Sequence, residues 1–302
     1  MPYVLSCESK DRALLEHFLG GGSMGKTIEY EKRLTLFIDF LGFSEIVKET
    51  VSDAEGLADL IDALNDASKI ASLGDAADFM MTQFSDCIVI SYKADRPAAL
   101  FQLVNKLSLL VVSIADRGYL LRGGLTFGDL LHTDKIVVGP ALLRAHELES
   151  TVASAPRVII DPVAFDTVLT NPSYQHEPSE ELEYVRSFLK QDTDGFWFFD
   201  YFSWGTVVEA TGVDNLRYPE YLTTLSGLIE RGLKNPSAKV LEKYIWMHKL
   251  YNVAREPFVD VPAEHSSHTT YPGYADTIAA LPSLDQPASK AVEAIYKAKA
   301  QL

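Results

Sequence analysis

Apolar residues along the first two-thirds of the chain follow two alternating patterns. In some stretches they form short β-prone runs bounded by turn residues, which is typical of strands. In others they recur every three or four residues, which is typical of helices with one buried face. Strand-like runs occur at residues 33–40, 78–84, 87–92, 119–128, 136–138, 157–161 and 196–202, and helical spacing at 44–71, 97–117 and 140–150. Within 44–71 the spacing places these apolar residues on one side: Ile46, Val47, Leu57, Leu60, Ile61 and Leu64.

Two of the strand-like runs, DFMMTQF and CIVISY, are separated only by Ser85 and Asp86, a connection that predicts a β-hairpin. The elements then follow the order strand, helices, strand, strand, helix, strand. This is the βαββαβ order of the ferredoxin-like fold. We therefore predict an α+β protein with a ferredoxin-like core.

After about residue 204 the pattern becomes helical. Helices are expected near 218–233, 237–254 and 289–300, with a Pro-, Ser- and His-rich loop between the last two. We divide the chain into an N-terminal helix and Gly-rich linker (1–31), a central α+β domain (32–203) and a helical C-terminal extension with a tail (204–302).

Composition restricts the partners. The chain has 302 residues, of which 42 are acidic and 27 basic, and its formal net charge is -15. Such a surface repels nucleic-acid backbones and anionic lipid, so neither is an expected partner. A phosphate-bearing ligand must then be held by a local cation, most simply a divalent metal ion. The most apolar stretch, Leu107 to Ala115, is too short to span a bilayer. With two cysteines and no recognisable targeting segment, a cytoplasmic protein is expected.

One motif is misleading. The sequence GGGSMGKT at 20–27 fits the Walker A pattern, in which a glycine-rich loop and a helix N-terminus bind phosphate. That chemistry requires a strand before the loop and a helix after it. Here a helix-like segment precedes the loop and a strand follows it, so we interpret these residues as a linker.

Two aspartates give a stronger signal. Asp39 stands near the end of the apolar run 33–40, and Asp86 lies in the predicted hairpin turn. In a ferredoxin-like sheet the third strand lies antiparallel to the first, so the end of one and the start of the other meet at the same edge. Two carboxylates and a backbone carbonyl form a hard-oxygen site suited to Mg²⁺ or Mn²⁺. Backbone donors at Gly42, Phe43 and Ser44 would bind phosphates next to it.

At these residues the chain resembles the class III nucleotide cyclases. FIDFLGFS at 37–44 is similar to the segment that holds the first metal aspartate of that family, and Ser85-Asp86 to the hairpin that holds the second. RGGLTFG at 122–128 and GPALLRAHELE at 139–149 are similar to a later strand and helix of the family. The resemblance covers roughly residues 33–165.

The resemblance implies a ferredoxin-like cyclase domain that converts a nucleoside triphosphate to its 3′,5′-cyclic monophosphate and pyrophosphate. It implies two Mn²⁺ or Mg²⁺ ions per site, held by Asp39, Asp86 and the Phe40 carbonyl. It also implies a homodimer with composite sites. The two residues that read the purine base in the family correspond to Thr82, which is neither Lys nor Glu, and to Ile136. The transition-state arginine of the family falls on Glu147, so the candidates for that role are Arg144, Arg122 and Lys135, of which the two arginines are favoured.

Because this chain lacks the purine-reading residues of the family, a nucleotide substrate with another base is favoured. RGGLTFGDLLH, DGFWFFDYF and the helical C-terminal extension resemble the pyrimidine cyclases of bacterial anti-phage Pycsar systems. Those enzymes make cyclic UMP or cyclic CMP, which acts on a separate effector protein. We therefore expect UTP or CTP as substrate, with UTP favoured. The alternatives are an adenylate cyclase with relocated base readers and a non-catalytic, cyclase-like module that binds nucleotide.

Overall fold

The computed structural model describes residues 28–73, 79–172, 177–212, 217–261 and 272–300. The chain from Glu31 to Leu302 forms one compact unit, separate from residues 1–30. The Walker-like segment 20–27, the expected N-terminal helix and Cys7 lie outside the described residues. Directly after that segment, residues 28–30 lead into a strand rather than a helix, and the linker stays a prediction.

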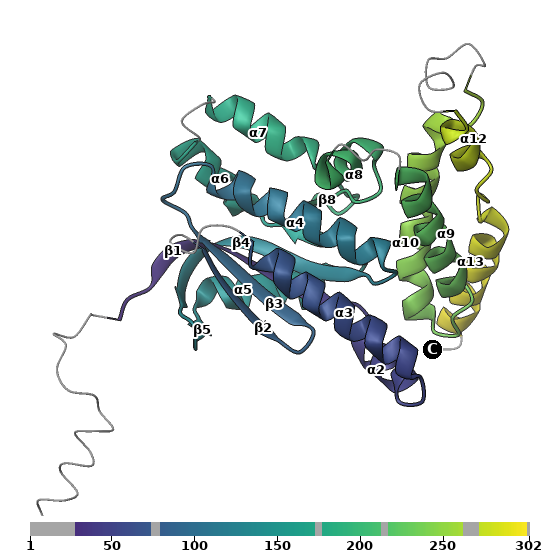
Figure 1. Cartoon of the computed structure of the whole chain (residues 1–302), viewed down its shortest axis with the longest axis horizontal. Coiled ribbons are helices and arrows are strands. Elements are labelled where there is room, and N and C mark those ends of the chain that lie inside the picture. Colours follow the sequence, from purple (N-terminus) through teal and green to yellow (C-terminus); the bar gives the residue numbers. More distant parts are fainter. Residues whose placement is uncertain (1–27, 74–78, 173–176, 213–216, 262–271, 301–302) are drawn as a thin grey trace, which may run out of the picture. The chain divides into compact units, whose positions relative to one another are not determined.

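A mostly antiparallel sheet with strand order β2-β3-β1-β4-β6-β8-β7 is the centre of the fold (Figure 1). The central strand β1 pairs antiparallel with both β3 and β4, and β6 joins β4 in parallel. The first four strands, in the order β2-β3-β1-β4, have the arrangement of a ferredoxin-like βαββαβ unit. The strands are β1 (Glu31–Phe40), β2 (Phe79–Phe84), β3 (Cys87–Lys93), β4 (Leu121–His132), β5 (Val137–Val138), β6 (Val158–Ile160), β7 (Leu189–Gln191) and β8 (Trp197–Phe199).

Alternation along β1 gives the sheet two different faces. The side chains of Leu34, Leu36, Ile38 and Phe40 are at most 1% exposed and belong to the main hydrophobic core. This face is covered by α3 (Ala54–Ala71) and α4 (Ala99–Asp116), which lie next to each other (Figure 1). The opposite face carries the alternate residues of β1, including Asp39, so the candidate site lies on the face away from α3 and α4.

α5 (Pro140–Glu147), which continues as a π-helical turn (Leu148–Val152), packs on that opposite face against β1 and β4. The packing is close: a Cβ on Gly124 of β4 would lie 2.5 Å from Leu148 and 2.6 Å from the Ala145 carbonyl. Helix–sheet contact thus explains Gly124, whereas a Cβ on Gly123 would lie 2.4 Å from the Phe37 carbonyl of the neighbouring strand β1.

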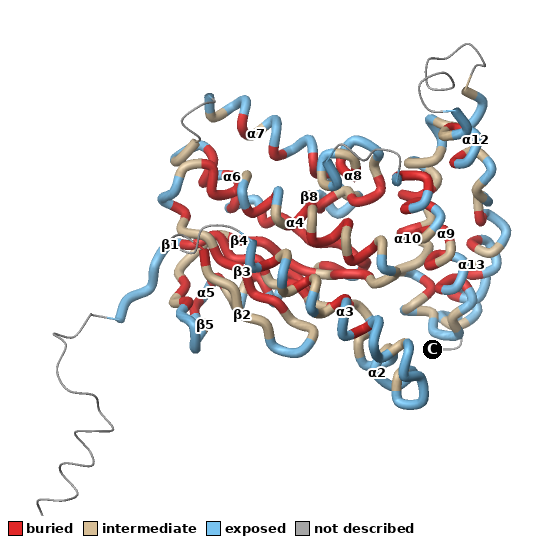
Figure 2. Tube along the Cα trace, in the orientation of Figure 1, coloured by how far each residue is buried: buried red, intermediate tan, exposed pale blue. Residues whose placement is uncertain are grey.

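α4 is apolar and long enough to span a membrane by composition alone, but 67% of its most apolar window is buried inside the protein (Figure 2). Core helices of globular proteins have the same property. As the sequence predicts, Leu107 to Ala115 form a buried helix face.

The C-terminal region is helical, as predicted. α10 (Ala238–Arg255) packs against α9 (Tyr218–Gly232) and α13 (Asp285–Lys299), with the short α12 (Tyr274–Ala279) beside α9. The hydroxyls of Tyr218 and Tyr221 donate to the carbonyls of Phe202 (2.7 Å) and Tyr201 (2.8 Å). These helices therefore share one core with the sheet, and the domain boundary at 203/204 stays a prediction.

The structure confirms the predicted α+β fold with a ferredoxin-like core and a helical C-terminal region, but it corrects several details. The segment 44–71 contains two helices, α2 (Phe43–Thr50) and α3, and Leu57 and Ile61 are 44% and 48% exposed. The buried side of α3 consists of Leu60, as predicted, and the small residues Ala63, Ala67 and Ala71. Strand β7 and four helices were missed: α6 (Pro162–Thr170), α7 (Pro178–Ser187), α8 (Trp204–Thr211) and α12, which lies where a loop was expected.

Candidate metal centre

Asp39 and Asp86 meet at one edge of the sheet. Ile38 of β1 is directly opposite Ile88 of β3, so the end of β1 lies beside the start of β3 and the turn before it. One carboxylate oxygen of Asp39, one of Asp86 and the Sγ atom of Cys87 all lie within 4.8 Å of one another. Ser85 has a positive φ of 56°, and this left-handed residue makes the two-residue turn possible. The approach of Asp39 and Asp86 that the strand order predicts is therefore confirmed.

The electrostatics of this cluster favour a bound cation. Burial raises the pKa of Asp39 to about 7, and the hydrogen bond and negative charge of Asp86 and the charge of Glu149 act in the same direction. Without a cation, the ionised form of Asp39 is therefore disfavoured. A divalent cation would relieve this repulsion, and carboxylate oxygens are the ligands that Mg²⁺ and Mn²⁺ prefer.

Cys87 is a structural neighbour in this cluster. Its thiol donates a long hydrogen bond of 3.6 Å to Oδ1 of Asp39. Burial and the nearby carboxylates raise the pKa of the Cys87 thiol to about 12, so it remains protonated at neutral pH. Since metal ligation by cysteine requires the thiolate, the hard oxygens of the two aspartates define the site.

The N-terminus of α2 lies directly after this edge. Gly42 has a left-handed φ of 79° and precedes the helix without a side-chain cap, and its carbonyl accepts from the amides of Glu45 and Ile46. The amides of Phe43 and Ser44 belong to the first turn, where the helix itself supplies no acceptor. Phe40 is 1% exposed and its ring packs near Phe43, so its backbone carbonyl is the group that could bind a metal.

Arg122 of β4 is paired with Asp39 in the ladder between β1 and β4. Its guanidinium forms an ion pair with Glu149, which is 3% exposed in the π-helical turn. Within the described residues the Arg122 Nε atom is buried without a hydrogen-bond partner. The structure thus brings Arg122 to the site, but with a carboxylate already bound to it.

Arg144 is held elsewhere in this chain. On α5, its Nε donates to Oδ2 of Asp161 (2.8 Å) and a terminal nitrogen to Glu147 (2.9 Å). Asp161 directly precedes α6, so this ion pair joins α5 to the start of α6. Thr82, on β2, lies on the same face of the sheet as Asp39, and its hydroxyl contacts Nε2 of His132 at 3.0 Å.

The sequence analysis missed Lys243. This half-buried lysine of α10 has its pKa lowered by burial and by the positive charges of Arg122 and Lys239, whereas Glu149 and Glu45 oppose the shift. These interactions place its ammonium near β4, the π-helical turn and α2, around the same end of the sheet. Only the docking of the C-terminal helices brings Lys243 there, so no local motif could have identified it.

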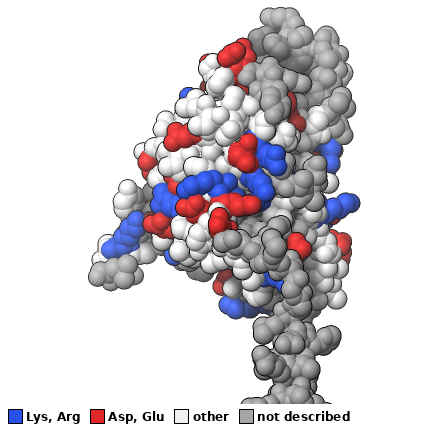
Figure 3. All heavy atoms as spheres, turned by 90° about the vertical axis from the view of Figure 1, so that its left-hand side faces the viewer, with Lys and Arg blue, Asp and Glu red and all other residues white. Residues whose placement is uncertain are grey.

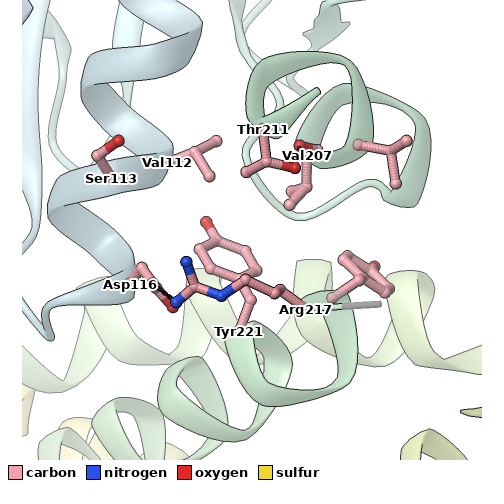
Figure 4. A pocket seen from close by; sticks show the side chains of 9 residues that line it. Val112, Ser113, Asp116, Val207, Thr211, Arg217 and Tyr221 are labelled. Carbon is pink, nitrogen blue, oxygen red and sulfur yellow. Dashed lines mark hydrogen bonds and ion pairs between the residues drawn. The ribbon is translucent and has the colours of Figure 1, made fainter. Parts of the chain in front are cut away.

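Other polar features are separate from this cluster. A small cavity between α4, α8 and α9 is lined by Val112, Val207, Tyr221 and the ion pair Arg217–Asp116 (2.8 Å), as Figure 4 shows. On the side of the molecule shown in Figure 3, basic and acidic side chains lie next to one another. Among the described residues, no broad basic surface is seen on that face.

No family model and no curated protein matches the chain. Among solved structures it is similar to the catalytic core of a rhodopsin-guanylyl cyclase with converted specificity, in complex with ATPαS (19% identity, TM-score 0.37, 46% of this chain and 82% of that one). It is also similar to the adenylyl cyclase CyaB from P. aeruginosa (17%, 0.36, 47% and 82%). A third is the monomeric guanylyl cyclase domain of the RhoGC fusion protein from the aquatic fungus Blastocladiella emersonii (17%, 0.40, 57% and 95%). Similarity at such low identities and TM-scores says nothing about function. The function is therefore inferred from the geometry of the candidate site.

Proposed function

We propose that this protein is a metal-dependent nucleotide cyclase that converts a pyrimidine nucleoside triphosphate, UTP in preference to CTP, to its 3′,5′-cyclic monophosphate and pyrophosphate. The observation that carries the proposal is the approach of Asp39 and Asp86, with carboxylate oxygens within 4.8 Å, at the edge where β1 leads into α2. Two carboxylates next to a helix N-terminus suit a metal-bound polyphosphate.

Asp39, Asp86 and the Phe40 carbonyl would hold two Mn²⁺ or Mg²⁺ ions. When bound, such ions activate an attacking hydroxyl and neutralise the charge of a leaving pyrophosphate. The amides of Phe43 and Ser44 would bind and orient phosphate oxygens. Burial of Asp39 keeps part of the site away from water, which strengthens the electrostatic interactions there.

A cyclase also needs a cation at the charge that develops on the phosphate in the transition state. Arg122 is the nearest candidate on the sheet, and its charge is partly balanced by Glu149. Lys243 is a second cation at the same end of the sheet. Arg144 would contribute only to the site of another subunit, in a homodimer with composite sites, once it leaves Asp161 and Glu147.

The pyrimidine substrate and a role in anti-phage defence rest on the motif resemblance and on Thr82 standing where purine cyclases carry Lys or Glu. In that role a cytoplasmic enzyme would make a cyclic nucleotide, which acts on a separate effector protein.

A second candidate function is a non-catalytic module that binds a nucleotide. One observation favours it: both arginines expected to stabilise the transition state are bound by carboxylates of the same chain. Such a module would bind a triphosphate and release no pyrophosphate.

The test is incubation of the full chain with ATP, GTP, CTP or UTP and Mn²⁺, followed by chromatography of the products. Cyclic UMP as the main product supports the proposal, and both Asp39→Asn and Asp86→Asn should abolish it. Asp53→Asn, at the exposed N-cap of α3, is the matched control and should retain activity. Binding without any cyclic product would favour the second candidate. Full activity of Asp39→Asn would contradict a catalytic metal site at Asp39.

A further inference from the structure

A buried arginine joins the sheet to the C-terminal helices close to the metal centre. Arg157, directly before β6, is 3% exposed, and its carbonyl accepts from the amide of Gly123 at 3.2 Å. Gly123 follows Arg122, which is the ladder partner of Asp39. Because β6 runs parallel to β4 with Val158 opposite Gly123, Arg157 lies beside Arg122, one strand further from Asp39.

The guanidinium of Arg157 connects its own strand to two other segments. One terminal nitrogen donates to Oδ2 of Asp192 (2.5 Å) and the other pairs with Asp194, and both aspartates lie in the turn between β7 and β8. The second nitrogen also donates to the carbonyl of Val152 (3.4 Å), which ends the π-helical turn that carries Glu149. Since a buried charge needs partners of opposite charge, the two carboxylates hold the β7–β8 turn against this edge.

Asp192 extends this connection to α10. Its Oδ2 atom, which Arg157 already binds, also accepts from Nε1 of Trp246 at 2.7 Å, and its Oδ1 atom accepts from the amide of Thr193. The Trp246 ring packs on Phe198 of β8, with the ring centroids 5.2 Å apart. An indole N–H can only donate and an ionised carboxylate can only accept, so the direction of this hydrogen bond is fixed.

Trp246 is the residue through which α10 is hydrogen-bonded to the sheet region. Among the described residues, the other side-chain hydrogen bonds and ion pairs that leave α10 lead to α9, α12, α13 or the residues between α12 and α13. Lys243 lies one turn before Trp246, and helical residues three apart share a face. The charge of Lys243 interacts with those of Arg122, Glu149 and Glu45, around the metal centre. The hydrogen bond of Trp246 therefore fixes the part of α10 that carries Lys243.

We propose that Arg157, Asp192 and Trp246 are positioning residues, which hold α10 where Lys243 can bind the phosphates of a nucleotide at the metal centre. This inference rests on the proposed function, since it assumes a metal-bound triphosphate at that centre. Lysine carries its charge on a flexible stem, and ordering the stem and the helix beneath it costs conformational entropy. A helix that is already fixed reduces this cost. The C-terminal helices thereby contribute a residue to the nucleotide site.

The experiment uses Trp246→Phe in the full chain, which keeps a ring against Phe198 and removes the N–H donor. The matched control is Trp204→Phe at the start of α8, which removes an indole hydrogen bond of 2.9 Å to the Tyr274 hydroxyl. The KM for UTP and the dissociation constant of α,β-methylene-UTP are measured with Mn²⁺. We expect Trp246→Phe to raise both constants about three-fold, as part of the contribution of Lys243, with kcat nearly unchanged. Trp204→Phe should leave both constants unchanged.

A double-mutant cycle separates positioning from a general structural effect. In a Lys243→Met background, Trp246→Phe should not change either constant further, because the group that it positions is absent. Asp192→Asn removes the charge of the acceptor, weakens the same hydrogen bond, and should show the same coupling to Lys243→Met. A rise of equal size in both backgrounds overturns the inference, and so does an unchanged affinity in Trp246→Phe.

The two constants also separate this inference from the proposed function. If the nucleotide binds and no cyclic product forms, the proposed function fails, and the dissociation constants still decide the role of Trp246. If cyclic product forms and the cycle shows no coupling, the inference alone fails. If no nucleotide binds to the wild-type protein, both fail.

Discussion

Asp39 of β1 and Arg122 of β4 are direct partners across the antiparallel ladder, on the same face of the sheet. The carboxylate best placed to bind a metal ion therefore lies beside a guanidinium, and that guanidinium is bound to Glu149 rather than left free. Glu149 also contributes to the raised pKa of Asp39. The three residues form one electrostatic unit, in which a change at any position alters the other two.

The first prediction concerns Arg122. Arg122→Met leaves the 3% exposed Glu149 without its partner, and removing one member of a buried ion pair is strongly destabilising. We expect the free energy of unfolding to fall by about 3 kcal/mol, as measured by urea denaturation. The double variant Arg122→Met/Glu149→Gln should recover most of this stability, because the orphan charge is gone.

The same pair of variants separates structure from catalysis. If Arg122 stabilises the transition state, the double variant folds and still forms no cyclic product. A stable, fully active double variant would contradict a catalytic role for Arg122. An Arg122→Met variant as stable as the wild-type protein would contradict the importance of the ion pair.

The second prediction concerns stability without metal. Because the pKa of Asp39 is raised to about 7, the folded state holds this proton more tightly than the unfolded chain between about pH 4 and pH 7. The stability contributed by the group is thus lost as the pH rises through that window. At pH 8 in EDTA, Asp39→Asn should melt at a higher temperature than the wild-type protein.

Added Mn²⁺ should stabilise only the wild-type protein, since metal binding requires both carboxylates. Equal Mn²⁺-induced shifts in the two proteins would exclude Asp39 as a ligand.

The sequence predicted the approach of Asp39 and Asp86 because two local signals combine with one topological rule. The apolar run before Asp39 and the two-residue connection at Ser85-Asp86 each fix a strand end, and the βαββαβ order places these ends together. The position of Lys243 was not predictable in this way, because it depends on how α10 docks against the sheet. The contacts of His132 with Ser91 and Thr82 were missed because β4 continues to His132, four residues beyond the expected end at Gly128. Arg144 was expected at the site from motif position alone, which does not show that Asp161 holds its guanidinium.

The third prediction concerns acid stability. The pKa of His132 is lowered from 6.5 to about 4, so the unfolded chain binds more protons than the folded protein between these values. The free energy of unfolding should therefore fall as the pH is lowered from about 6.5 to 4. We expect the melting temperature of His132→Gln to fall less over this range than that of the wild-type protein. His146→Gln, at an exposed position of α5, is the control and should follow the wild-type protein. Identical acid dependence in all three would show that His132 does not control it.

The fourth prediction concerns the contribution of the C-terminal helices to the site. Lys243 is half-buried among the like charges of Arg122 and Lys239, an arrangement that disfavours its ammonium form until an anion is bound. A triphosphate at the N-terminus of α2 would supply that anion, with Lys243 reaching it from α10. Lys243→Met should therefore raise the KM for the triphosphate roughly ten-fold, because charge-assisted hydrogen bonds to phosphate are among the strong ones.

The matched control is Lys249→Met, which removes an exposed lysine of the same helix and should leave the KM unchanged. Lys243→Arg should restore most of the affinity, since it returns a cation to the same position. The KM of the variants and its dependence on salt concentration distinguish a binding role of Lys243 from a structural one. A lysine that only packs against its neighbours would, when replaced by Met, leave the KM unchanged. A contact with phosphate makes the KM depend on the charge at position 243, and this dependence should weaken as salt concentration rises.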